Sequence, residues 1–114
     1  MAWMMEGPDI ELGPQATTVL ALVFHELATN AAKHGALSSS QGKLEVRWRS
    51  QDDRTTITWA ETNGPPIVAC PTHQGFGTLL AERSLGALGG RISLGWPEQG
   101  LSAQIEIPSA SLVR

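Results

Sequence analysis

Apolar residues recur at helical spacing between residues 14 and 35. At about 100° per residue, one arc of such a helix carries Leu20, Val23, Phe24, Leu27, Ala28 and Ala31. The adjoining arc, roughly 100° wide, carries Glu26, Asn30, Lys33 and His34. Gly13-Pro14 favours a helix start, because proline suits a first turn, and Gly35 favours a left-handed cap at the end. We therefore predict a helix here, with one packed face and one polar face beside it.

Alternating apolar and polar residues predict strands over 9–12, 43–49, 55–61, 91–96 and 102–107. The turn residues 51–54 and 97–100 join the later strands into two hairpins. Residues 36–42 read as a surface loop, residues 63–77 as a long irregular stretch, and residues 78–88 as a second helix closed by Gly89-Gly90. This order predicts an α+β two-layer sandwich, with both helices on one face of a mixed, mostly antiparallel sheet.

Composition predicts one small globular domain over residues 1–114, with 41% hydrophobic and 17% charged residues. A net charge of −3 provides no basic stripe for nucleic acid. The chain lacks both an apolar run of about 20 residues and a basic amphipathic helix, which argues against a membrane role. The lone Cys70 excludes an intrachain disulfide, and residues 1–5 lack the regions of a signal peptide. We expect a cytoplasmic protein.

The polar arc of the first helix presents groups that suit a nucleotide. The carboxylate of Glu26 and the amide of Asn30 are hard oxygen ligands of the kind that Mg²⁺ prefers. The ammonium of Lys33 is a point charge that suits phosphate. The alternative at this point is an amphipathic helix whose polar stripe only meets water.

Three ordered segments resemble the motifs of one ATP-binding fold. Residues 24–35, FHELATNAAKHG, resemble the N box of the Bergerat or GHKL fold, which sensor histidine kinases share with type II topoisomerases and MutL. Residues 59–66 resemble its first glycine box and residues 75–80 its second. His25, Trp59 and Glu61 match the signature of the HWE subfamily of bacterial histidine kinases. The resemblance covers nearly the whole chain and identifies it as a histidine-kinase ATP-binding catalytic domain.

The resemblance implies a role for each matching residue. Asn30 is expected to coordinate Mg²⁺, and Glu26 to orient a metal-bound water or assist the acceptor. Glu61 is expected to accept a hydrogen bond from the adenine amine at the mouth of a cleft. Phosphate, ribose and backbone contacts are expected from Lys33, His34, Gly64, Gly75, Gly77 and Thr78. Residues 65–74 correspond to a short ATP lid, and Asn63 stands where most relatives carry glycine.

Some of these residues also have plainer interpretations. Trp59 is expected in the core rather than stacked on a nucleotide, and Thr78 could serve as a plain helix cap. His25 is expected to pack or to make a structural hydrogen bond. His25-Glu26 lacks the second histidine of a zinc motif, because position 29 is Thr29. His25 also lies about 140° from Asn30 on the helix, away from the predicted metal.

The resemblance implies partners as well. The phosphoacceptor histidine is expected on a separate dimerisation domain absent from this chain, with a response regulator downstream. Two alternative functions stay open: a GHKL ATPase or serine kinase like the anti-sigma factors, and a degenerate module that binds a partner without nucleotide.

Overall fold

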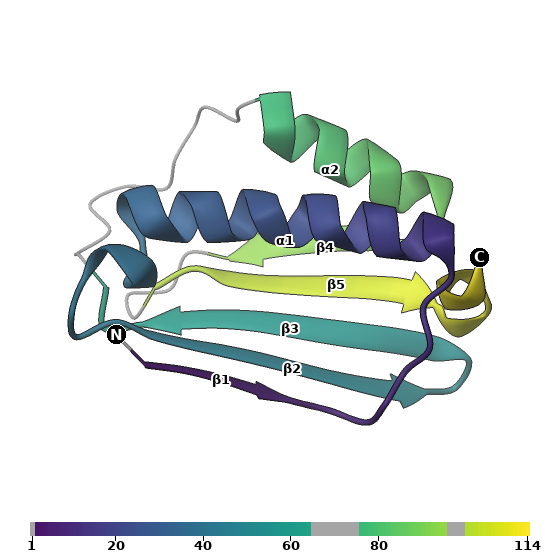
Figure 1. Cartoon of the computed structure of the whole chain (residues 1–114), viewed down its shortest axis with the longest axis horizontal. Helices are drawn as coiled ribbons and strands as arrows, with labels where there is room; N and C mark the ends of the chain where they lie inside the picture. Colours follow the sequence, from purple (N-terminus) through teal and green to yellow (C-terminus); the bar gives the residue numbers. More distant parts are fainter. Residues whose placement is uncertain (1, 65–75, 96–99) are drawn as a thin grey trace.

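The computed structural model describes residues 2–64, 76–95 and 100–114. Within these residues lie β1 (Ala2–Glu6), β2 (Lys43–Gln51), β3 (Arg54–Thr62), β4 (Arg91–Gly95) and β5 (Ser102–Pro108). They form one sheet in the order β1-β2-β3-β5-β4, in which only the β1–β2 pair is parallel. The helices α1 (Pro14–His34) and α2 (Phe76–Ala87) lie together on one face of that sheet (Figure 1). The predicted two-layer α+β sandwich is confirmed.

The core lies between α1, α2 and the helix-facing side of the sheet. Alternate residues of each strand point into it, because successive side chains of a strand lie on opposite faces. The buried apolar residues of the strands are Leu44, Val46, Ile57, Trp59, Ala103, Ile105 and Ile107. Trp59 is 3% exposed, and its ring stacks on Phe24 of α1 with 6.2 Å between the ring centroids. The core position expected for Trp59 is confirmed.

The chain turns where the sequence predicts. Asp52 and Asp53 join β2 to β3 with φ angles of 52° and 63°, the left-handed pair that a two-residue hairpin turn requires. Gly89 follows α2 with a φ of 77°, and the N–H of Gly90 donates to the carbonyl of Leu85 at 2.8 Å. Asn63 takes a left-handed φ of 57°, which asparagine tolerates better than most residues.

The first strand is not where alternation placed it. The strand predicted over residues 9–12 is irregular chain, and the strand is instead β1, which pairs in parallel with β2. Gly7 lies against the ring of Trp48, and the Trp48 indole N–H donates to the carbonyl of Pro8 at 2.7 Å. Pro8 has no backbone N–H to donate to the hydrogen bonds between strands. The chain therefore leaves the sheet at Gly7-Pro8, and the alternation beyond it does not form a strand.

The expected left-handed cap at Gly35 is also wrong. Gly35 ends α1 with a φ of −119°, and its carbonyl accepts the N–H of Ser38 at 3.0 Å. The backbone thus passes straight into a short 3-10 helix, η1 (Ala36–Ser38), instead of reversing. A second 3-10 helix, η2 (Ser109–Val113), follows β5.

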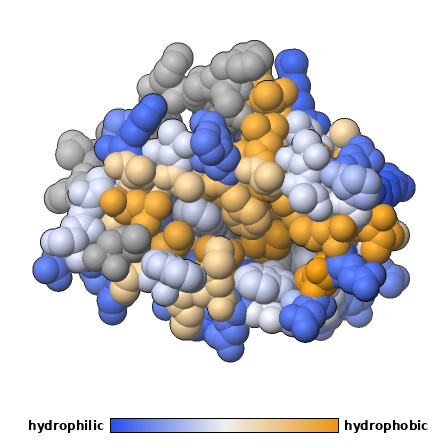
Figure 2. All heavy atoms as spheres, in the orientation of Figure 1, coloured by the Kyte–Doolittle hydropathy of each residue, from blue (hydrophilic) through white to orange (hydrophobic). Residues whose placement is uncertain are grey.

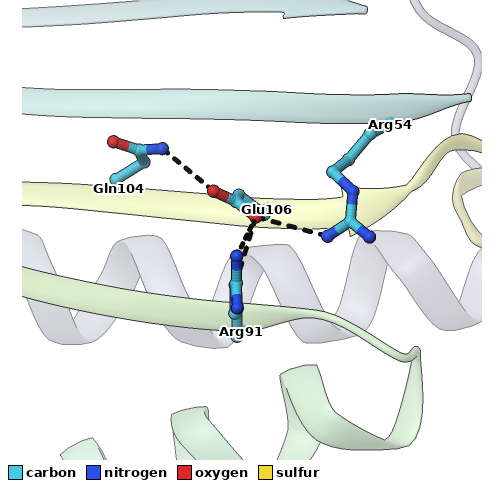
Figure 3. Close-up of polar contacts among 4 residues, drawn as sticks. All are labelled: Arg54, Arg91, Gln104 and Glu106. Carbon is cyan, nitrogen blue, oxygen red and sulfur yellow. Dashed lines mark hydrogen bonds and ion pairs between the residues drawn. The ribbon is translucent and has the colours of Figure 1, made fainter. Parts of the chain in front are cut away.

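The sheet face opposite the helices is polar and carries an ordered cluster around Glu106 (Figure 3). Its Oε2 accepts from Arg91 at 2.8 Å and from Arg54 at 3.2 Å. Its Oε1 accepts from the side-chain amide of Gln104 at 3.0 Å. The hydrogen bond from Arg91 is the main reason that the pKa of Glu106 lies below its ordinary value. The cluster ties β3, β4 and β5 together on this face.

Candidate functional site

Three elements meet at one end of the molecule (Figure 1). α1 ends there, β3 ends there, and α2 begins on the same side. The predicted N box lies on α1 and ends at Gly35 just after it, the first glycine box begins in the last residues of β3, and the second box includes the start of α2. The fold therefore gathers the three motifs that the sequence spreads over more than fifty residues.

Glu61 is the central residue of this end. It occupies the inward row of β3 that continues from Ile57 and Trp59, where the strand pattern otherwise places apolar residues. The residue is 3% exposed. Its Oε1 accepts the backbone N–H of Ala36 at 2.9 Å, and its Oε2 accepts the indole N–H of Trp59 at 2.9 Å. Burial of a carboxylate is tolerated because both oxygens have donors.

Glu61 is thus buried in this structure, and neither of the two hollows described below includes it. Each carboxylate oxygen has two acceptor sites, and each uses one of them here. The carboxylate keeps acceptor capacity toward a further donor. The sequence did not indicate the Ala36 contact, because Ala36 lies 25 positions away along the chain.

Three glycines pack closely around Glu61 and its neighbour Ala36. A Cβ atom at Gly35 would overlap Glu61 Oε1, and one at Gly100, whose φ is 142°, would overlap the Glu61 carbonyl oxygen. A Cβ at Gly64 would lie 2.9 Å from the backbone nitrogen of Ala36. Gly64 was predicted for close approach to a nucleotide, and here it allows close approach of two protein segments. The sequence motifs did not indicate these packing roles of Gly35 and Gly100.

The polar face of α1 is arranged as the helical spacing predicts. Glu26 and Asn30 are half-buried and stand one turn apart, whereas Lys33 and His34 are exposed on the last turn. A carboxylate and an amide at this spacing form an oxygen donor set that fits Mg²⁺, and it leaves further positions for water and phosphate oxygens. His25 is exposed, so the packing expected of its side chain is not observed.

The second glycine box lies partly outside the described residues. Gly75 and the predicted lid over residues 65–74 fall outside them. α2 begins at Phe76, two residues before the predicted start. Gly77 and Thr78 therefore lie inside its first turn, where backbone N–H groups have no acceptor within the helix. Thr78 is therefore the third residue of α2.

Two hollows in the described part of the chain lie elsewhere. One is an apolar groove of about 380 Å³ between α1, η2 and the edge of the sheet, lined by residues such as Ile10, Leu20 and Phe24. The other is a shallow depression of about 530 Å³ on the open sheet face, lined by Arg47, Arg49 and neighbours. Neither includes a predicted site residue. Neither α1 nor α2, the longer helices among residues 2–64, 76–95 and 100–114, could cross a membrane.

The arrangement matches solved histidine kinases. The histidine kinase domain of a blue-light-activated histidine kinase from Erythrobacter litoralis aligns with 98% of this chain and 56% of its own, with a TM-score of 0.80 and 16% identity. The catalytic domain of the histidine kinase ThkA aligns with 95% of this chain and 79% of its own, with a TM-score of 0.70 and 20% identity. The fold is that of these histidine kinase catalytic domains.

Sequence relatives agree with the fold. Blue-light-activated histidine kinase 1 of Erythrobacter litoralis is 41% identical over 104 residues, which are 90% of this chain and 29% of that protein. A blue-light-activated histidine kinase of Rhizobium johnstonii is 40% identical over 110 residues, which are 94% of this chain and 32% of that protein. No protein-family model matches. The chain is a relative of these histidine kinases and spans about a third of their length.

Proposed function

We propose that this chain is the ATP-binding catalytic domain of a cytoplasmic two-component sensor histidine kinase of the HWE type. ATP and Mg²⁺ bind where α1, β3 and α2 meet, and the γ-phosphate passes to a histidine on a separate dimerisation domain. The observation that carries the proposal is the buried Glu61 carboxylate, a fixed acceptor between the N-box helix and β3. The 41% identity to a histidine kinase supports the reaction class.

Glu61 reads the base in this proposal. Its two protein donors fix the carboxylate, and its remaining lone pairs accept the exocyclic amine of adenine. Gly64 keeps the chain after β3 close to the backbone of Gly35 and Ala36, whose N–H holds the carboxylate. A buried polar group that orients a ligand is the usual source of specificity in a nucleotide site.

Asn30 would hold Mg²⁺ through its amide oxygen, and Glu26 would orient a water beside the ion or assist the acceptor histidine by taking its proton. When bound, Mg²⁺ neutralises charge on the phosphates. In the transfer, the histidine nitrogen bonds to the γ-phosphorus, the bond from that phosphorus to the bridging oxygen breaks, and ADP leaves. Positioning and charge stabilisation are the main demands of this chemistry.

The phosphates lie against the start of α2. The unpaired N–H groups and the positive end of the helix dipole attract anions, and Gly75 and Gly77 let backbone approach. Thr78 contributes its backbone N–H. Lys33 and His34 on the last turn of α1 contact phosphate or ribose.

The dimerisation domain needs a surface near those phosphates. Leu79 and Leu80 are 39% and 41% exposed on α2, and Figure 2 shows a small group of apolar side chains at the surface over this helix. An exposed apolar patch marks a contact for another protein surface. A response regulator acts downstream; ThkA, which shares this fold, has been solved in complex with the response regulator protein TrrA.

Two other functions compete with this one. A GHKL ATPase or serine kinase would use the same nucleotide site, and Trp59 together with His25, both part of the HWE signature, favours the histidine kinase over both. A degenerate module that binds a partner without nucleotide is disfavoured, because Glu26 and Asn30 stand together on one helix face.

Calorimetric titration of the chain with a nonhydrolysable ATP analogue, with and without Mg²⁺, tests the proposal. Binding that tightens with Mg²⁺ supports it. Absence of binding under both conditions points to the degenerate module. A separate incubation with ATP itself tests for the ATPase, because hydrolysis of ATP by the isolated chain points to that function.

A further inference from the structure

We infer that Trp59 is a positioning residue for base recognition, whose indole N–H fixes the Glu61 carboxylate in the orientation that separates adenine from guanine. The inference rests on the proposed function and deepens it. It assigns a chemical role to a residue that the strand pattern explains as core packing alone.

The geometry of the pair leaves little freedom. Trp59 and Glu61 stand two positions apart on β3 and therefore point to the same face of the sheet. The indole nitrogen lies 2.9 Å from Glu61 Oε2. The Trp59 ring is buried and stacked on Phe24 at an interplanar angle of 25°. Because the ring cannot turn, its N–H has a fixed direction, and so has the oxygen that accepts it.

The pair also satisfies two buried groups at once. A buried indole N–H needs an acceptor, and a buried carboxylate needs donors. Ala36 holds Oε1 and Trp59 holds Oε2, so the two donors together set the plane of the carboxylate. Without the indole N–H, the hydrogen bond from Ala36 holds only Oε1, and the carboxylate can then rotate about its side-chain bonds.

A fixed acceptor is what discriminates between the bases. Adenine presents an amine at the position where guanine presents a carbonyl oxygen. If the carboxylate cannot turn, one of its oxygens faces the guanine carbonyl oxygen, and neither group can donate a hydrogen bond. The free-energy cost of these two unpaired acceptors weakens GTP binding. A carboxylate that can rotate avoids the clash with guanine and aligns less well with adenine.

The experiment compares Trp59→Phe with Trp48→Phe. Phenylalanine keeps an aromatic ring against Phe24 but has no N–H. Trp48 is a matched control, since its indole N–H also donates one hydrogen bond, to Pro8 at 2.7 Å, on the neighbouring strand and away from Glu61. The dissociation constants of nonhydrolysable ATP and GTP analogues are measured for each protein in one Mg²⁺ buffer.

We expect the preference for ATP over GTP to fall about threefold or more in Trp59→Phe and to stay unchanged in Trp48→Phe. In a Glu61→Gln background, Trp59→Phe should change the preference no further. An unchanged preference in Trp59→Phe, or an equal effect in both backgrounds, would overturn the positioning role. A wild-type chain that binds neither analogue would instead contradict the proposed function.

A second measurement needs no change at Trp59. In the ¹H–¹⁵N spectrum of the chain, the Trp59 indole resonance should be protected from exchange with water and should shift in Glu61→Gln. The ATP analogue should shift it more than the GTP analogue does. A resonance that ignores Glu61→Gln and exchanges freely would contradict the hydrogen bond on which the inference depends.

Discussion

Gly35 lies directly against the carboxylate of Glu61, so close that a methyl group at position 35 would overlap Oε1. The N–H of the next residue, Ala36, donates to the same oxygen at 2.9 Å. The end of α1 and the end of β3 are thus joined through one side chain. Glycine is required at position 35 because the contact leaves no space for a side chain, and its φ of −119° is one that any residue could adopt.

Gly35→Ala should therefore destabilise the fold and weaken nucleotide binding. Insertion of a methyl group into a packed contact typically costs about 1–3 kcal/mol, and the carboxylate must move to admit it. Urea denaturation gives the free energy of unfolding, and titration with a nonhydrolysable ATP analogue gives the affinity.

Gly86→Ala is the matched control for that variant. Gly86 lies in α2, and a Cβ atom added there would meet no atom within 4 Å. Gly86 is the second-to-last residue of α2, so alanine there should be neutral or should stabilise the fold by up to about 1 kcal/mol. Equal free energies of unfolding for the two alanine variants would show that the space beside Glu61 is not restricted.

Much of the fold could be predicted because local patterns determine it. The apolar residues of α1 recur with a clear 3.6-residue period, and apolar and polar residues alternate clearly in β2, β3 and β5. The turn residues Asp52-Asp53 favour a tight hairpin between β2 and β3. β1 was not predicted, because Ala2–Glu6 is exposed along its whole length and its apolar and polar residues do not alternate. Its strand conformation depends on pairing with β2, which lies almost forty residues later.

The sequence predicted which residues belong to the candidate site, but it did not predict which residues they contact. Glu61, Asn30 and Glu26 could be named from their motifs. Ala36 and Gly100 could not, because they reach Glu61 through the tertiary fold rather than through a local pattern. A charged residue in the inward row of β3, next to Trp59, was the one available indication that the carboxylate needs buried donors.

Asn30→Ala should remove most of the gain in ATP affinity that Mg²⁺ provides, because the amide oxygen is the proposed ligand. Asn30→Asp should alter the dependence on metal concentration. Gln15→Ala, which removes an exposed amide from the first turn of the same helix, is the control and should behave as wild type. The checking measurement is titration with and without Mg²⁺, and an undiminished Mg²⁺ effect in Asn30→Ala would rule out the ligand role.

Glu106 should make stability depend on pH in the acid range. Arg91 holds the pKa of Glu106 below its ordinary value of 4.5, so the folded state binds a proton less readily than the unfolded state. Its contribution to stability is complete above that value and is lost as the pH falls toward the lowered pKa. The difference in unfolding free energy between wild type and Glu106→Gln should therefore be largest at neutral pH and shrink in acid.

Glu45→Gln provides the comparison for Glu106. The Glu45 side chain is 51% exposed and lies 3.8 Å from Arg47, a surface pair that contributes little. Denaturation curves across the acid range should coincide for Glu45→Gln and wild type. A pH-independent difference for Glu106→Gln would mean that the ion-pair cluster does not shift its titration.

The chain alone should bind ATP without labelling itself. The proposed acceptor is a histidine on another domain, and exposed His25 lies on the side of α1 away from the Asn30 arc. Incubation with ATP radiolabelled at the γ-phosphate should leave no acid-labile phosphate on the protein. Stable phosphohistidine on the purified chain would refute the claim that the acceptor lies elsewhere.

The most direct test of the central claim is the base preference of wild type and Glu61→Gln. If the fixed carboxylate accepts the adenine amine, wild type should bind ATP about tenfold or more tightly than GTP, because an unpaired buried acceptor costs on the order of 1–3 kcal/mol. Glutamine has nearly the same size as glutamate and can donate an N–H. The variant should therefore bind ATP less tightly, and the difference between its ATP and GTP affinities should be smaller than in wild type. Equal affinity for ATP and GTP in both proteins would contradict the account, since Glu61 would then not read the base.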